Sequence, residues 1–134
     1  MINKSKLVGT MEPDDLIAGL EPAPMVHGAT IRKGSAETTY KRGTIMAKSS
    51  GTAGDGKLVI LGSTAASSET LTADCILCDD VTVGTGADEA VAVYVGGCFN
   101  ANKAIVKAEY DLTEADKDAL RVRGIILKAE APAK

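Results

Sequence analysis

Two cysteines three positions apart are the first residues in this chain whose spacing could support chemistry. Cys75 and Cys78 form a C-x-x-C pair inside an apolar run that is typical of a strand. A zinc site needs further ligands at suitable spacing, and a thioredoxin-type site places the pair at a helix start. Residues three apart on a strand point to opposite faces, with Cα atoms about 10 Å apart, which is too far for a disulfide. We therefore interpret Cys75, Cys78 and Cys98 as free, largely buried thiols without a metal.

The other candidates for chemistry are one histidine, one glycine-containing loop and three acidic pairs. His27 is the only imidazole, and it lies in a segment that we expect to be too mobile to hold a catalytic base. The spacing Gly51-x-x-x-x-Gly56-Lys57 resembles a phosphate-binding loop, but Leu58 replaces the hydroxyl that would hold magnesium. We interpret the acidic pairs as turn and surface charges, because they lack EF-hand spacing; they are Asp14-Asp15, Asp79-Asp80 and Asp88-Glu89. No catalytic residue, cofactor or metal site is predicted, and we do not expect an enzyme.

The composition favours a protein that works by assembling through its surface. Of 134 residues 45% are apolar, but the chain has one Phe, three Tyr and no Trp. A monomer with so few large aromatic residues has a thin core, so we expect an oligomer. The net charge of −3 and the pI of about 5.1 argue against nucleic-acid binding. No apolar run is long enough to span a membrane, no secretory signal is recognisable, and three cysteines fit a reducing cytoplasm.

The first 27 residues differ from the rest of the chain. They contain three of the four prolines and few apolar residues. Because proline removes a backbone donor and disfavours helix before it, we expect residues 1–27 to form an extended arm whose removal leaves the domain folded. Residues 28–129 are expected to form one β-rich domain, and residues 130–134 a flexible tail.

Short apolar runs separated by turn residues predict that this domain is mostly β. The runs cover residues 43–48, 57–61, 73–83 with a break at Asp79-Asp80, 90–99 and 104–107, and we expect the last two to pair. The Asp55-Gly56 dipeptide is a hairpin signal between the first two runs. One short helix is predicted at 114–123, with a capping box from Thr113 to Asp116 and Gly124 as its stop.

Several segments carry a resemblance to a known family. They are Arg42-Gly-Thr-Ile-Met-Ala, Lys57-Leu-Val-Ile-Leu, the Cys-Ile-Leu-Cys-Asp-Asp-Val run at 75–81, Ala-Val-Tyr-Val-Gly-Gly-Cys-Phe-Asn at 92–100, and residues 112–127. In this order they resemble the head decoration proteins of tailed bacteriophages, the family of the lambda head decoration protein. The resemblance covers about 30–127, and the Gly-x-Phe-Asn turn followed by the capped helix is its most characteristic part. The chain departs from that pattern in a longer loop at 48–56 and in its arm.

The resemblance implies a mostly β domain with one short α-helix, of the β-clip or β-tulip type. It also implies a homotrimer that binds the major capsid protein on the outer surface of the expanded head, at local threefold positions, and reinforces the shell. The protein would be made in the host cytoplasm and reside in the virion. A small oligomeric β-module of a phage tail or fibre is the alternative, and a small β-fold enzyme comes third.

Within the arm, five apolar residues are the candidates for binding the capsid. An extended arm can add a strand to an exposed sheet edge, where its backbone forms hydrogen bonds and its side chains fill pockets. We therefore predict that the arm clamps the protein to the shell through Leu16, Ile17, Leu20, Met25 and Val26.

Overall fold

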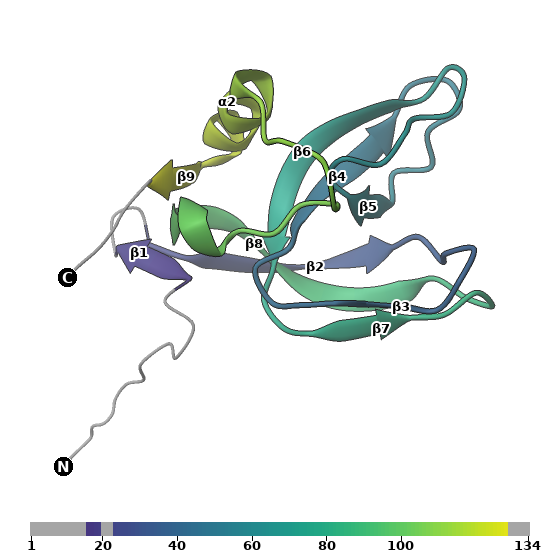
Figure 1. Ribbon diagram of the computed structural model, residues 1–134, viewed down its shortest axis with the longest axis horizontal. Coiled ribbons are helices and arrows are strands. Elements are labelled where there is room, and N and C mark those ends of the chain that lie inside the picture. Colours follow the sequence, from purple (N-terminus) through teal and green to yellow (C-terminus); the bar gives the residue numbers. More distant parts are fainter. Residues whose placement is uncertain (1–15, 20–22, 129–134) are drawn as a thin grey trace, which may run out of the picture.

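The computed structural model describes residues 16–19 and 23–128 (Figure 1). As the sequence predicts, this part of the chain is mostly β and contains one α-helix. The helices are the 3-10 helix η1 (Ala101–Lys103) and the α-helix α2 (Glu114–Arg123). The strands are β1 (Ile17–Gly19), β2 (Met25–Ile31), β3 (Thr38–Tyr40), β4 (Ile45–Ser50), β5 (Leu58–Ile60), β6 (Thr70–Leu77), β7 (Val81–Val83), β8 (Glu89–Asn100) and β9 (Ile125–Lys128).

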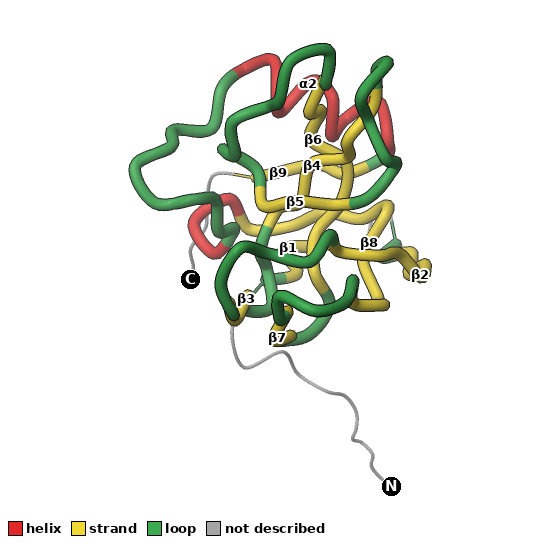
Figure 2. The backbone as a smooth tube through the Cα atoms, turned by 90° about the vertical axis from the view of Figure 1, so that its right-hand side faces the viewer, coloured by secondary structure: helices red, strands yellow, loops and turns green. Residues whose placement is uncertain are grey.

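The main sheet closes into a small barrel-like structure around β8. From β8 the pairing passes through β2, β5, β4 and β6, and β6 pairs again with β8. β1 and β9 pair with the C-terminal end of β8, while β3 and β7 form a separate two-stranded sheet. Helix α2 lies on one side of the barrel and the β3–β7 sheet on the opposite side (Figure 1, Figure 2).

The barrel buries two apolar clusters, one on each side of its central strands. The cluster beneath α2 includes Phe99 and Leu120, and the cluster beside β3–β7 includes Met46 and Val93. Alternation along β4 produces this division, since successive side chains of a strand point to opposite faces. Ile45 and Ala47 accordingly enter the first cluster, and Met46 enters the second.

The cysteines follow the same two-sided arrangement. Cys75 belongs to the second cluster and Cys78 to the first, as expected for residues on opposite faces. All three cysteines are buried and free, which confirms the predicted burial. Burial raises the pKa of the Cys78 thiol to about 11 and also raises that of Cys75. Both thiols are therefore protonated at neutral pH and poorly nucleophilic.

Helix α2 has the predicted bounds and the predicted ends. The Thr113 hydroxyl accepts a hydrogen bond from the Asp116 N–H, and the Asp116 carboxylate accepts one from the Thr113 N–H, which completes the capping box. The Tyr110 hydroxyl also donates to Asp116, which ties the preceding loop to the helix. Gly124 ends the helix in the left-handed region with φ of 102°, where a side chain would be disfavoured.

The predicted pairing of 90–99 with 104–107 is wrong. The Asn100 side chain accepts a hydrogen bond from the Asn102 N–H, so the chain turns into η1 instead of a hairpin. Residues 104–107 then run beside the start of β4, where Ile105 makes an isolated parallel bridge with Thr44. The backbone groups of Ile105 are satisfied there, because Ile45 N–H donates to its carbonyl and its own N–H donates to Gly43.

The folded domain begins before the boundary that we placed between residues 27 and 28. That boundary falls inside β2, and Leu16 is only 1% exposed within the first apolar cluster. Strands β1 and β2 both pair with β8, so their backbone N–H and C=O groups form hydrogen bonds within the domain despite the nearby prolines. Residues 1–27 therefore include strands of the domain. The C-terminal tail, 130–134, lies outside the described residues.

The two ends of the described domain lie close together. The Asn100 N–H at the end of β8 donates to the Leu16 carbonyl, and Lys128 is the neighbour of Asn100 on β9. The first 15 residues and the last six therefore join the domain at the same end of β8.

The backbone conformation of Gly97 in β8 can be tested by substitution. Its φ is 138°, and a Cβ atom there would lie 2.8 Å from the Phe99 ring and 3.2 Å from Pro24 Cα. We expect Gly97→Ala to lower the free energy of unfolding by about 2 kcal/mol or more, because positive φ and the clash both oppose it. Chemical denaturation measures this loss. Gly28→Ala is the matched control, since no atom lies within 4 Å of its Cβ position; equal stability of the two variants would contradict the argument.

Candidate binding surface

The first half of β2 is exposed on both of its faces. Residues 25–28 are all exposed, and Met25 and Val26 each keep 56% of their surface accessible. One edge of β2 pairs with β8 along its whole length, whereas the other edge meets β5 only at Ile31. Between residues 25 and 30, backbone groups along the second edge therefore have no partner strand within 16–19 and 23–128. Such an open, partly apolar edge is a template for pairing with another chain.

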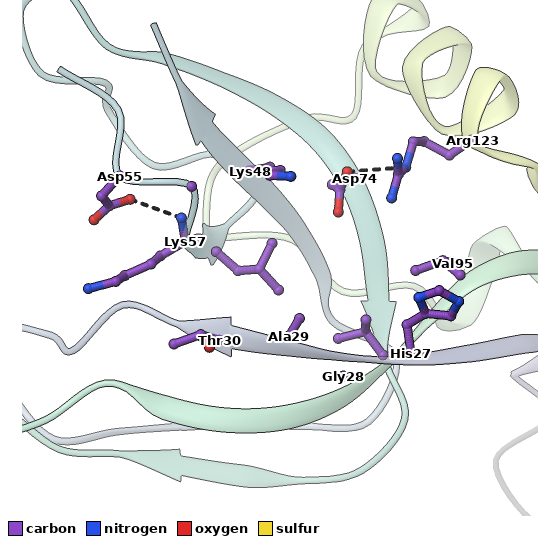
Figure 3. A pocket seen from close by; sticks show the side chains of 13 residues that line it. His27, Gly28, Ala29, Thr30, Lys48, Asp55, Lys57, Asp74, Val95 and Arg123 are labelled. Carbon is purple, nitrogen blue, oxygen red and sulfur yellow. Dashed lines mark hydrogen bonds and ion pairs between the residues drawn. The ribbon is translucent and has the colours of Figure 1, made fainter. Parts of the chain in front are cut away.

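A groove of about 450 Å³ runs along this open edge (Figure 3). β2 forms one wall, with His27 and Thr30 among the lining residues. The opposite wall comes from β4 and β6 and from the end of α2, which contribute Lys48, Asp74 and Arg123. Val93, Val95 and Leu58 add apolar surface. The lining thus combines a few charged groups with aliphatic side chains.

Asp74 enters the groove because β6 contains a bulge. The register between β4 and β6 pairs Met46 with Cys75 and Ala47 with Ala73, so Asp74 has no residue opposite it. Its carboxylate forms an ion pair with Arg123 of α2, with Nε 3.2 Å away. This ion pair joins the helix to the sheet at one end of the groove (Figure 3).

The groove carries a surplus of cationic side chains. The carboxylate of Asp74 faces Arg123, and the carboxylate of Asp55 accepts two hydrogen bonds from Arg32. Lys48 is exposed and has no carboxylate partner among the described residues. His27 adds an imidazole to the groove. It lies in β2, paired with Val93 of β8, and not in a mobile segment as we had expected. The described surface is therefore suited to a carboxylate on a bound partner.

At the other end of the groove, an ion cluster fixes the loops on either side of β5. Arg32 donates to Asp55 at 2.9 and 3.0 Å and to Glu69 at 2.5 Å. The Glu69 side chain is only 4% exposed, and it also accepts from the Ala66 N–H and the Ser49 hydroxyl. These hydrogen bonds hold the pKa of Glu69 at about 2, mainly through Ala66, and Arg32 lowers the pKa of Asp55 to about 2.

Lys57 and Asp88 make a second link beside this cluster. Lys57 Nζ lies 2.5 Å from the Asp88 carboxylate, which also accepts from the Lys33 N–H. The segment from Gly51 to Lys57 is the loop of the β4–β5 hairpin, as the Asp55-Gly56 signal predicts. Lys57 is engaged in the ion pair with Asp88. The Gly51-x-x-x-x-Gly56-Lys57 spacing therefore belongs to a hairpin loop and not to a phosphate-binding loop.

The predicted capsid-binding residues divide between the core and the surface. Leu16 is buried, and Ile17 packs against the same cluster while pairing with Phe99. Leu20 lies outside the described residues. Met25 and Val26 are exposed, and they flank the groove at its β2 wall. Apolarity alone, which selected all five residues, does not distinguish a buried contact from an exposed one.

Residues 16–19 and 23–128 contain neither a metal-binding cluster nor a membrane-spanning helix. No group of three or more His, Cys, Asp or Glu side chains there is placed to hold a metal ion. Over the same residues, no helix has the length and apolarity needed to cross a bilayer. Asp80 serves a turn, accepting from the Arg42 N–H at 2.8 Å and lying 3.7 Å from Lys41.

Comparison with known families identifies the chain. A family model described as bacteriophage lambda head decoration protein D matches residues 15–125. The chain belongs to this family. No curated protein matches the sequence at a significant level. The match includes the open edge of β2, the groove and the capped helix, so the surface described here is part of the family domain.

Family membership establishes the general class of this protein. Members are structural proteins that decorate the phage head, and the family is in general non-enzymatic. Membership therefore implies association with the phage capsid and residence in the virion. This agrees with an exposed surface that offers backbone groups and apolar side chains to a partner.

The ion cluster generates a prediction about acid stability. Glu69 has a pKa of about 2 in the folded protein against 4.5 ordinarily, so its stabilising effect is complete above about pH 5 and disappears as the pH falls to 2. We expect Glu69→Gln to lower the melting temperature at pH 7 and to reduce the further loss between pH 5 and 2. Thermal unfolding across this range measures both effects. Glu37→Gln, at an exposed position, is the control; parallel curves for wild type and Glu69→Gln would contradict the proposed linkage.

Proposed function

We propose that this protein is a cementing protein that binds the outer surface of the expanded phage head as homotrimers at local threefold positions. The partner is the major capsid protein, and the bound trimers stabilise the shell. The observation that carries the proposal is the family match over residues 15–125, together with a domain of the expected mostly β class.

Two physical features support assembly. The described domain has few large aromatic side chains in its clusters, with Phe99 the largest fully buried residue, so further burial between subunits would add stability. Met25 and Val26 remain exposed on a strand with an open edge, and such a surface is costly to leave uncovered at high concentration. Three free, buried cysteines fit synthesis in a reducing host cytoplasm.

We place the shell contact at the exposed part of the segment that we first described as an arm. Because Leu16 and Ile17 pack in the domain, the described contact residues of that segment are Met25 and Val26.

Purified protein mixed with undecorated shells tests the proposal. We expect binding to expanded shells only, density at local threefold positions in electron cryomicroscopy, and a higher disruption temperature of the decorated shell. Unexpanded shells are the control. Copies located only on tails or fibres would instead favour the tail-module alternative, and dimers or single copies away from threefold positions would contradict the trimer.

Truncation tests the contribution of the upstream residues. Deleting residues 2–15 should leave the melting temperature of the free domain nearly unchanged, because the described fold begins at Leu16, and should weaken shell binding. Deleting residues 1–27 should unfold the domain, because it removes Leu16, β1 and part of β2. Circular dichroism and shell occupancy separate these outcomes. Full occupancy by the shorter truncation would show that the domain binds without the first 15 residues.

A further inference from the structure

We propose that the groove beside β2 is the docking site for an extended, acidic segment of the shell subunit, which adds as a strand to the open edge of β2. This inference rests on the proposed function, since it assigns a surface and a recognition chemistry to shell binding. The segment's backbone would pair with residues 25–30, and a carboxylate of the segment would face Lys48.

The open edge supplies the backbone part of this recognition. Between residues 25 and 30, β2 is paired with β8 on one side only, and β5 reaches it at Ile31. Six residues of strand extend about 20 Å, which is enough for several inter-strand hydrogen bonds. Gly28 lies in the middle of this edge, and no atom lies within 4 Å of its Cβ position, so the face of β2 is uncovered there.

The chemistry of the edge favours an extended segment over a helix. The N–H and C=O groups in the body of an α-helix bond to one another, so a helix has few backbone groups to offer the open edge of β2. An extended segment presents a row of such groups and can pair with this edge while its side chains enter the groove.

The charges of the groove specify an acidic partner. Both lining carboxylates already face arginines, Asp74 with Arg123 and Asp55 with Arg32. Lys48 projects from β4 without a carboxylate partner in the described chain, and His27 lies across the groove on β2 (Figure 3). A carboxylate placed between these walls would gain an ion pair with Lys48 without displacing an existing one. A basic segment would meet uncompensated repulsion.

A photo-crosslinking amino acid at position 27 identifies the occupant directly. We expect irradiation of decorated shells to link position 27 to an acidic segment of the shell subunit. The same amino acid at Ala65, in the exposed β5–β6 loop, is the control and should give no such product. A crosslink from position 27 to another copy of this chain, to residues 1–15 of the same chain, or to nothing would overturn the proposal.

Charge reversal tests the recognition chemistry independently. Lys48→Glu should weaken binding to expanded shells by about tenfold or more and leave the melting temperature of the free protein close to wild type, because Lys48 is exposed. Lys107→Glu changes the net charge equally at an exposed position outside the groove and should bind nearly as wild type. Equal affinity of Lys48→Glu and Lys107→Glu would overturn the assigned groove.

The wild-type protein in the same assay distinguishes failure of the groove assignment from failure of the proposed decoration function. Wild-type binding with an unaffected Lys48→Glu variant would refute the groove and leave the decoration function intact. Failure of the wild type to bind any expanded shell would refute both the proposed function and the groove assignment.

Discussion

Strand β8 shares its backbone hydrogen-bonding groups among four other strands, and the rest of the domain depends on that sharing. It pairs with β2 and β6 along its first part and with β1 and β9 near its end. The change of partners coincides with Gly96 and Gly97, both buried. Gly97 adopts a positive φ that brings the Phe99 ring against the backbone, so the bend and the first apolar cluster form together.

The same arrangement explains why one sheet edge stays open. β5 is only three residues long and meets β2 at a single position, so the barrel closes at Ile31 and separates toward Met25. The bulge at Asp74 bends β6 on the opposite wall, and its ion pair with Arg123 holds α2 beside the gap. A binding groove thus results from a short strand and a bulge, two ordinary features of β-sheets.

The thin core and the exposed strand are two aspects of one stability problem. A domain with one Phe and three Tyr relies on aliphatic clusters and on local ties such as the Arg32–Glu69 ion cluster. The Glu69 carboxylate is buried, and its ion pair and hydrogen bonds offset the cost of removing it from water. The family to which the chain belongs associates with the phage head, and burial of exposed apolar residues such as Met25 and Val26 in that association would stabilise the domain further.

The sequence by itself determined the features that depend on neighbouring residues. The capping box from Thr113 to Asp116, the stop at Gly124 and the Asp55-Gly56 hairpin are all present, because turn and cap chemistry acts over a few residues. The placement of Cys75 and Cys78 on opposite sides also follows from strand periodicity.

Only the tertiary structure decided which apolar residues are available to a partner. Leu16 and Met25 look alike in the sequence, yet one is buried in the same cluster as Phe99 and the other is half exposed, because β1 and β2 pair with a strand far along the chain. The bridge between Ile105 and Thr44 and the bulge at Asp74 likewise follow from long-range pairing. Register between distant strands is set by the packing of the whole barrel, which no local pattern encodes.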